Sequence, residues 1–286
     1  MRAIATVGIM SKPKIAGAAE IVCGLLEWLR RRGVVFRCDE QTAEYANLSE
    51  FFPREEVPLG ADLVIVLGGD GTLLAAARFV AGLDIPLFAV NLGHLGFLTA
   101  TKLEDLFEEL EQVVKGSYRI GKRQMLDCEL VREGKSIARY SALNDIVIAK
   151  SELARMIDLD TFVGDHFVAA YKADGLIVST PTGSTAYSLS AGGPVIFPSV
   201  AAFCITPICP HMLTNRPVIV PDTSVIRILS RAEDGTYLTV DGQVGEPIHK
   251  GDRVICRASP KSIQLIRPPK MLFFDVLREK LKWGER

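Results

Sequence analysis

Residues 63–80 read LVIVLGGDGTLLAAARFV, and this stretch decides the fold of the first part of the chain. Its opening residues, 63–67, form a continuous apolar run of the length expected for a buried strand. Gly68 and Gly69 end the run, and apolar residues then recur at helical spacing from Leu73 to Val80. The stretch therefore predicts a buried strand, a tight turn and a helix.

A helix is expected before this stretch, and the order of strand and helix is expected to repeat after it. Upstream, residues 18–32 carry apolar side chains at helical spacing and end at Gly33, a natural residue for a helix C-terminus. Downstream, residues 85–90 form a second apolar run, and residues 103–114 form a helical stripe that starts with the capping-box pattern of 101–104. Strands that alternate with helices predict a mostly parallel sheet, with ligands at the carboxyl ends of its strands.

The period of the apolar residues changes to two after Arg123, which is the period of a half-buried strand. Many short strands with turn signals between them predict a β-sandwich-like domain. The strands are expected at residues 125–131, 137–142, 146–148, 157–163, 166–171, 218–220, 225–229, 237–240, 253–256 and 263–266.

The expected fold class is therefore α/β plus all-β. A Rossmann-like α/β domain is predicted for residues 1–120 and a β-sandwich domain for residues 121–268. The segment 269–286 becomes helical again after two prolines, and we expect this helix to return to the first domain and pack on it.

Composition limits the classes of function. The 286 residues suit two domains, and 48% apolar with 23% charged residues is ordinary globular usage. A formal net charge of -1 offers no cationic field for nucleic acid or an anionic membrane, so neither is expected as a partner. The apolar stretch 195–209 is too short to span a bilayer, no signal peptide is indicated, and six scattered cysteines suit a reducing cytoplasm.

The glycine loop that follows the first strand is the first candidate site. Consecutive glycines let backbone N–H groups converge on an anion, and the following helix N-terminus adds a favourable dipole. Asp70 is unexpected in such a loop, because a carboxylate repels phosphate. A role for Asp70 in taking a proton from an attacking hydroxyl accounts for it, and the simpler alternative is that Asp70 caps the helix.

Other catalytic and metal motifs are absent from the sequence. Residues 116–122 match GxxxxGK, but Arg123 stands where a P-loop needs Ser or Thr, and Leu74 replaces the third glycine of a dinucleotide-binding fingerprint. The four histidines and the cysteines never approach zinc-site spacing, and no serine lies in a nucleophile elbow. No metal site formed by protein ligands is expected.

Three further polar segments are candidates for ligand binding. Residues 91–98 follow the second strand, and within them Phe97 could stack on a base or fill the core, while His94 is more simply structural than catalytic. Residues 174–194 are rich in Gly, Ser and Thr, which suits a hydrogen-bonding surface for a flat polar ligand. Asn144-Asp145 adds an amide and a carboxylate at a strand edge, where a plain turn is the alternative.

Together these segments resemble the NAD kinase family. The loop 68–72, GGDGT, is similar to its signature, although diacylglycerol, sphingosine and 6-phosphofructo-type kinases share that loop. The block 174–194 resembles the long central motif of the family and is far more specific. The resemblance covers most of the chain from about Asp62 onward and extends through 92–99, 144–145, 207–211, 215–217 and 241–243.

This resemblance implies transfer of the γ-phosphate of ATP to the 2′-hydroxyl of the adenosine ribose of NAD, which gives NADP. It implies that Asp70 is the general base, that Mg²⁺ accompanies ATP, with polyphosphate open as a second donor, and that a homodimer or homotetramer shares its sites between subunits. The phosphate loop would be Gly68, Gly69, Gly71 and Thr72, and NAD would be bound by Gly71, Phe97, Asn144, Asp145, Asp174, Thr182, Thr185, Ala186, Tyr187, Ser190 and Gln243.

Two positions depart from the family pattern. Many members carry Glu where this chain has Asp145, and an acidic residue is often seen at the position of Ala100. Two other functions stay open at this point. One is a lipid or sugar kinase with the same loop, and the other is a non-catalytic NAD(P) sensor. The polar character of 174–194 speaks against a lipid substrate, and the carboxylate of Asp70 speaks against a sensor.

Overall fold

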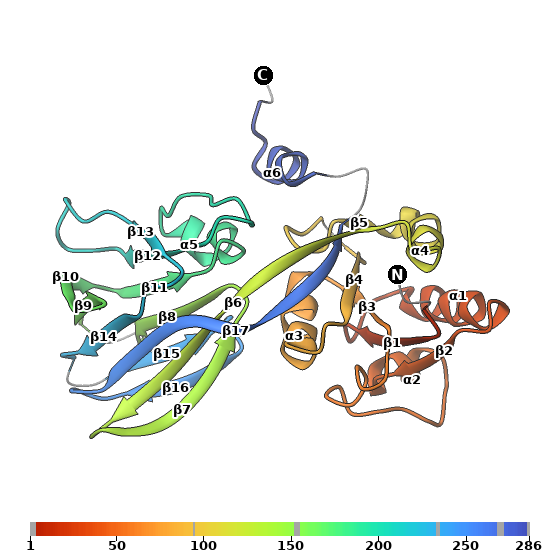
Figure 1. The fold of residues 1–286 in the computed structure, drawn as a ribbon, viewed down its shortest axis with the longest axis horizontal. Helices are drawn as coiled ribbons and strands as arrows, with labels where there is room; N and C mark the ends of the chain where they lie inside the picture. Colours follow the sequence, from red (N-terminus) through yellow and green to blue (C-terminus); the bar gives the residue numbers. More distant parts are fainter. Residues whose placement is uncertain (1–3, 94, 152–154, 233–234, 268–271, 285–286) are drawn as a thin grey trace. The chain divides into compact units, whose positions relative to one another are not determined.

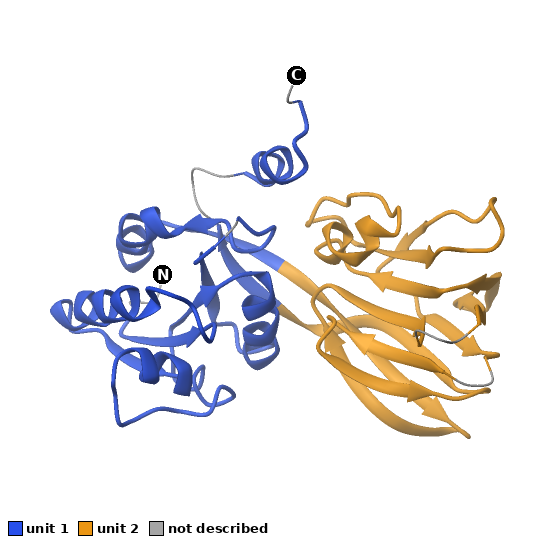
Figure 2. Cartoon of the chain, turned by 180° about the vertical axis from the view of Figure 1, so that it is seen from behind, with its two compact units in different colours: residues 1–122, 263–286 blue, residues 123–262 orange. Residues whose placement is uncertain are grey.

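A computed structural model describes residues 4–93, 95–151, 155–232, 235–267 and 272–284, and it divides into two compact units. Unit 1 comprises Met1–Lys122 and Ile263–Arg286, and unit 2 comprises Arg123–Ser262 (Figure 2). The chain passes from unit 1 to unit 2 within strand β6 (Arg119–Arg132) and returns within strand β17 (Arg253–Arg267). Each unit has its own hydrophobic core.

Unit 1 is built on four parallel strands (Figure 1). Their order is β2 (Val35–Cys38), β1 (Thr6–Ser11), β3 (Leu63–Gly68) and β4 (Pro86–Asn91). Every residue of β3 and β4 is buried, because these two strands lie inside the sheet and their apolar side chains face both layers of the unit. Since the strands are parallel, the chain leaves all four at one edge of the sheet.

Helices cover this sheet with their apolar stripes. The helix α1 (Ala18–Arg31) buries Val22, Leu25 and Leu29 in the same core as the strands, and Gly33 follows it with a φ of 68°, as the sequence predicts. The remaining elements of this part are α2 (Glu40–Tyr45), α3 (Asp70–Val80), β5 (Thr101–Lys102), the 3₁₀ turn η1 (Leu103–Asp105) and α4 (Leu106–Val114).

The capping box expected at residues 101–104 is wrong. Thr101 pairs with Val90 in β5, and its Oγ1 donates to Oε2 of Glu109 at 2.8 Å rather than to a helix amide. Lys102 precedes η1 and makes no side-chain cap. The Thr101 hydroxyl is buried beside a buried carboxylate, so it satisfies that acceptor instead of the helix terminus.

Unit 2 consists of two mostly antiparallel sheets that enclose one core (Figure 1). Buried residues of this core come from both sheets, for example Leu159, Ile205 and Ile228. One sheet contains β6, β7 (Lys135–Ala142), β9 (Ile157–Val163), β10 (His166–Ala173), β14 (Ile226–Ser230) and β17, and the other follows the order β13 (Val218–Pro221), β12 (Ala202–Ile208), β11 (Gly175–Ser179), β8 (Asp145–Lys150), β15 (Thr236–Val240) and β16 (Val244–Ile248).

The predicted fold class is confirmed: an α/β unit and a mostly antiparallel β unit are present. One expectation is wrong in detail, because residues 253–256 and 263–266 belong to the single strand β17. The intervening residues stay extended without a turn, and the division between the two compact units falls inside this strand, after Ser262. The sequence does not predict the helix α2 or the strands β2, β5, β11 (Gly175–Ser179), β12 and β16.

The last described helix, α6 (Phe273–Leu281), groups with unit 1. It begins at Phe273, where the sequence predicts a helical tail. Oε1 of Glu279 lies 3.9 Å from Nζ of Lys102, and Nζ of Lys280 lies 5.4 Å from the centre of the Phe97 ring. None of the helices in the described ranges is long and apolar enough to cross a membrane.

The core of unit 2 provides a first prediction. Ile205 on β12 is fully buried, whereas Ile219 on the neighbouring strand β13 has 52% of its surface exposed. Replacing Ile205→Ala leaves a cavity, so we expect it to lower the free energy of unfolding by about 2–5 kcal/mol. The matched variant Ile219→Ala is expected to change it by less than about 0.5 kcal/mol. Urea unfolding measures both, and equal effects would contradict this packing.

Candidate functional site

The Asp70 carboxylate is held by the loop that follows β4. Its Oδ2 accepts the backbone N–H of Phe97 at 2.8 Å. Its Oδ1 accepts the N–H groups of Leu98 at 3.1 Å and Thr99 at 3.0 Å, and the Thr99 hydroxyl at 3.0 Å. Helix α3 starts at Asp70 and its N-cap residue is Gly69, without a side-chain cap. The alternative that Asp70 merely caps its helix is therefore wrong.

This arrangement leaves one carboxylate oxygen more open than the other. Three donors share Oδ1, whereas Oδ2 accepts one bond from the described residues, so Oδ2 retains capacity for a further proton donor. Thr99 is itself fixed, because its hydroxyl lies 2.9 Å from the Nδ2 donor of Asn91 at the end of β4. Asp70 thus links the end of β3 to the end of β4. These hydrogen bonds fix the direction in which the free lone pair of Oδ2 points.

Glycine at position 96 is required for this contact. A Cβ at Gly96 would overlap with the Asp70 carboxylate and with the Thr99 hydroxyl. Gly96 is the sixth residue of the segment 91–98, in which the sequence points to Phe97 and His94 as candidates but to no role for Gly96. Its backbone lies against Asp70 because it has no side chain, and this close approach lets the three following amides point at the carboxylate.

The glycines of the loop fall into two kinds. Gly68 is packed, since a Cβ there would meet the side chains of Thr72 and Lys12. At Gly69 and Gly71, in contrast, an added Cβ would meet nothing within 4 Å, and neither residue has a positive φ. Packing and backbone strain therefore do not explain glycine at positions 69 and 71. Open space beside the N-terminus of α3 is what an incoming anion requires.

The pair Asn144-Asp145 of unit 2 is held in a similar way by a carboxylate. Asp241 accepts the backbone N–H groups of Leu143 at 2.9 Å, Asn144 at 2.8 Å and Asp145 at 3.1 Å. Asp241 has a φ of 50° in the turn between β15 and β16. The sequence points to this residue only as part of the Asp-Gly-Gln turn, so its positioning role was missed.

The side chains of this pair are buried and chemically distinctive. Burial, together with the neighbouring Asp241 carboxylate, raises the pKa of Asp145 to about 7. The amide oxygen Oδ1 of Asn144 is buried, and none of the described residues donates a hydrogen bond to it. A carboxyl group that ionises near neutral pH can donate or accept a hydrogen bond, and an unsatisfied amide oxygen can accept one, so both suit the hydroxyl groups of a bound sugar.

The Ser/Thr-rich segment packs its turn against this pair. The Thr180 backbone N–H donates to the Asn144 carbonyl oxygen at 2.9 Å, and the Thr180 hydroxyl donates to the Leu143 carbonyl oxygen at 2.6 Å. A Cβ at Gly183 would overlap with the Asn144 backbone, so only glycine permits this approach. The 3₁₀ turn η2 (Gly183–Thr185) and helix α5 (Tyr187–Ser190) follow, with Thr182 and Thr185 buried, Ala186 partly exposed, and Tyr187 and Ser190 exposed.

Asp174 lies at the other end of the same strands. It forms an ion pair with Lys150 at 2.8 Å, and it precedes β11, whose far end pairs Ser179 with Asp145. Five residue steps of a strand separate the two positions by roughly 17 Å. Gln243 is exposed in the turn that Asp241 begins. The predicted unit 2 residues therefore lie along one sheet, with its polar groups at the two ends.

One sequence candidate, Phe97, contributes to the observed geometry through its backbone only. The ring of Phe97 is partly buried near Lys280, and its backbone rather than its ring contacts Asp70. His94 lies outside the described residues. No group of three or more His, Cys, Asp or Glu side chains that could hold a metal ion occurs within the part of the chain that the structure describes.

Comparison with family models matches both parts of the chain. Residues 7–118 match the ATP-NAD kinase N-terminal domain, and residues 143–268 match the ATP-NAD kinase C-terminal domain. Two curated relatives are similar over the full length. A NAD kinase of Solibacter usitatus is 63% identical over 100% of both chains, and a NAD kinase of Koribacter versatilis is 48% identical over 98% of this chain and 99% of that protein.

Two solved structures resemble this one. Yeast NADH kinase complexed with NADH has a TM-score of 0.91 and 28% identity, covering 100% of this chain and 89% of that one. A NAD kinase from Archaeoglobus fulgidus in complex with ATP has a TM-score of 0.76 and 26% identity, covering 95% of this chain and 98% of that one.

The raised pKa of Asp145 predicts how stability depends on pH. The folded chain keeps a proton on Asp145 up to about pH 7, whereas the unfolded chain loses it near pH 4, so stability falls as pH rises through this window. Asp145→Asn removes this loss. We expect the variant to be more stable than the wild type at pH 8 by roughly 2–4 kcal/mol, with the difference shrinking toward pH 5.

Urea unfolding at several pH values measures this difference. Asp165→Asn is the matched control, because the Asp165 side chain is 99% exposed and its replacement should not change stability in a pH-dependent way. A difference between Asp145→Asn and the wild type that stayed constant from pH 5 to pH 8 would contradict the raised pKa.

Proposed function

The chain belongs to the ATP-NAD kinase family, and on that basis we propose that it transfers the γ-phosphate of ATP to the 2′-hydroxyl of the adenosine ribose of NAD, giving NADP and ADP. The observation that carries the chemical part of this proposal is the Asp70 carboxylate. It is fixed by three backbone amides and keeps acceptor capacity on Oδ2, next to two glycines at which an added Cβ would meet nothing within 4 Å.

In the proposed step Asp70 is the general base. As the 2′-oxygen attacks the γ-phosphorus, Oδ2 receives the proton of that hydroxyl, the bond from phosphorus to the bridging oxygen breaks, and ADP leaves with the electron pair. The transition state of phosphoryl transfer is loose and highly charged, so alignment and charge neutralisation account for most of the acceleration. Hydrogen bonds from residues 97–99 keep the carboxylate oriented during this transfer.

The loop of Gly68, Gly69, Gly71 and Thr72 is proposed to bind the phosphates of the donor. Open space at Gly69 and Gly71 supports this role, since phosphate oxygens can reach the backbone N–H groups without meeting a Cβ. The ATP complex of the Archaeoglobus relative supports ATP as the donor.

The polar residues of unit 2 are proposed to bind NAD. Asn144 and Asp145 would hold the adenosine ribose through the amide oxygen and the carboxyl group described above. Asp174 would lie toward the nicotinamide, and its separation from Asp145 along β8 and β11 suits the two ends of an extended dinucleotide. The remaining contacts are proposed to come from Gly71, Phe97, Thr182, Thr185, Ala186, Tyr187, Ser190 and Gln243.

A magnesium ion is proposed to arrive with ATP as part of the substrate. Within the described residues the only carboxylate at the glycine loop is that of Asp70, and a site with one carboxylate suits Mg²⁺ that keeps phosphate oxygens and water as its other ligands. When bound, the ion neutralises charge on the phosphates. Asp70 and Thr72 are the residues of the glycine loop whose side-chain oxygens could contact the ion.

Assembly and location are proposed from the family and from composition. A homodimer or homotetramer would share sites between its subunits, as the resemblance implies. The six cysteines are free in this structure, which supports a reducing cytoplasm as the compartment. A lipid or sugar kinase and a non-catalytic sensor are not favoured, because both halves of the chain match the NAD kinase models.

Replacing Asp70→Asn tests the proposed base. Asparagine keeps one acceptor oxygen for the loop amides but cannot accept the proton, so we expect turnover to fall by about 10²–10⁴-fold while NAD still binds. NADP formation is measured with an NADP-specific dehydrogenase in the presence of ATP and Mg²⁺, and NAD binding is measured by calorimetry.

Asp84→Asn is the control for this variant, because Asp84 is an exposed carboxylate of the same unit and asparagine tolerates its φ of 54°. Near-normal turnover of Asp70→Asn would exclude Asp70 as the base. Absence of NADP formation by the wild type would exclude the proposed reaction itself.

A further inference from the structure

The residue that follows β1 lies directly beside the glycine loop of unit 1. Strand β1 pairs in parallel with β3, with Ser11 opposite Leu67, and the Lys12 backbone N–H donates to the Leu67 carbonyl oxygen at 2.8 Å. A Cβ at Gly68 would lie 3.0 Å from Cβ of Lys12. The Lys12 side chain therefore starts in contact with the first glycine of the loop.

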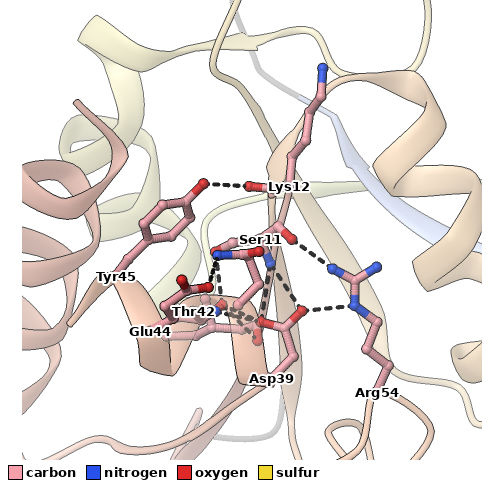
Figure 3. Close-up of polar contacts among 9 residues, drawn as sticks. Ser11, Lys12, Asp39, Thr42, Glu44, Tyr45 and Arg54 are labelled. Atoms are coloured by element: carbon pink, nitrogen blue, oxygen red, sulfur yellow. Dashed lines mark hydrogen bonds and ion pairs between the residues drawn. The ribbon is translucent and has the colours of Figure 1, made fainter. Parts of the chain in front are cut away.

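A buried polar network fixes the backbone at this point (Figure 3). Asp39 is 1% exposed and forms an ion pair with Nε of Arg54 at 2.8 Å. The other end of the Arg54 guanidinium donates from Nη2 to the Ser11 carbonyl oxygen at 2.7 Å, and the Asp39 carboxylate accepts the Ser11 N–H. Tyr45 donates its hydroxyl to the Lys12 carbonyl oxygen at 2.9 Å.

This network is a poor explanation for stability alone. Burying a carboxylate and pairing it with arginine contributes little net stability compared with apolar packing, because desolvation offsets the attraction. Its hydrogen bonds converge on the backbone of Ser11 and Lys12, and so they hold the end of β1 in one position. What they position is the side chain of Lys12.

The Lys12 side chain itself takes no part in the network. It extends away from Asp39 and Arg54 (Figure 3), it is exposed, and no acidic side chain within the described residues pairs with it. Arg54 lies near the same strand end, but its charge is already satisfied by Asp39. Lys12 is therefore the cation beside the glycine loop that remains available to a ligand.

We propose that Lys12 binds the terminal phosphates of the nucleotide donor. The loop supplies neutral amides and one carboxylate, Asp70, which repels phosphate. A protein cation beside the loop would offset the charge of Asp70 and add to the neutralisation of the phosphates by magnesium. A lysine ammonium is a flexible point charge that suits phosphate oxygens. The inference rests on the proposed role of the loop in binding the donor, and it makes Asp39, Arg54 and Tyr45 positioning residues for Lys12.

The test compares Lys12→Gln with Lys12→Arg and with the control Lys14→Gln, which removes another exposed lysine two residues away. Lys12→Gln is expected to raise the KM for ATP roughly tenfold or more, as loss of one charge-assisted hydrogen bond implies, and to leave the KM for NAD within about twofold. Lys12→Arg should restore most of the ATP affinity, and calorimetry with MgATP should give the same order of affinities.

Two results would overturn the inference. One is a KM for ATP in Lys12→Gln that rises no more than in Lys14→Gln, and the other is an equal rise in the KM values for ATP and NAD. If either result is found and the wild-type protein still makes NADP, the inference about Lys12 is wrong but the proposed function is not contradicted. A wild-type protein that binds no MgATP would remove the donor role of the loop and the inference with it.

Discussion

The Asp70 carboxylate accepts the backbone amides of Phe97, Leu98 and Thr99, and the chemistry proposed for unit 1 depends on this contact. It joins the ends of β3 and β4, which are neighbours in a parallel sheet but far apart along the chain. Because the amides occupy one oxygen more fully than the other, the carboxylate has a fixed orientation and one open lone pair. Glycine at position 96 makes the approach possible, so the segment 91–98 positions the carboxylate that is proposed to be the base.

Unit 2 uses the same device for a different purpose. Asp241 accepts three consecutive amides at residues 143–145, and in doing so it fixes the pair that the family resemblance assigns to NAD. Its charge also acts on Asp145, whose pKa rises because the carboxyl group is buried near a second carboxylate. Asp145 stays protonated up to about neutral pH. In both units a carboxylate orders a loop by accepting three consecutive backbone amides, and groups with unused hydrogen-bonding capacity are held in place as a result.

The sequence predicts the elements and the candidate segments well, because apolar periodicity and glycine turns are local signals. The strand, turn and helix at 63–80 and the change of period after Arg123 are examples. What it does not predict are contacts between segments. The partners of Asp70 lie near residue 97, so the helix-cap alternative stayed open, and Asp241 reads as an ordinary Asp-Gly turn because its three amide partners are nearly a hundred residues away. The capping box at Thr101 failed for the same reason, since the hydroxyl found a tertiary acceptor.

A double-mutant cycle of Gly96→Ala and Asp70→Asn tests most directly whether this contact supports catalysis. The added methyl group at position 96 displaces the Asp70 carboxylate, so Gly96→Ala should lower kcat for NADP formation by about tenfold or more while NAD binding persists. If the loop acts through Asp70, the double variant loses no more turnover than Asp70→Asn alone, because both changes remove the same function. Losses that multiply in the double variant, or a wild-type kcat for Gly96→Ala, would contradict the account.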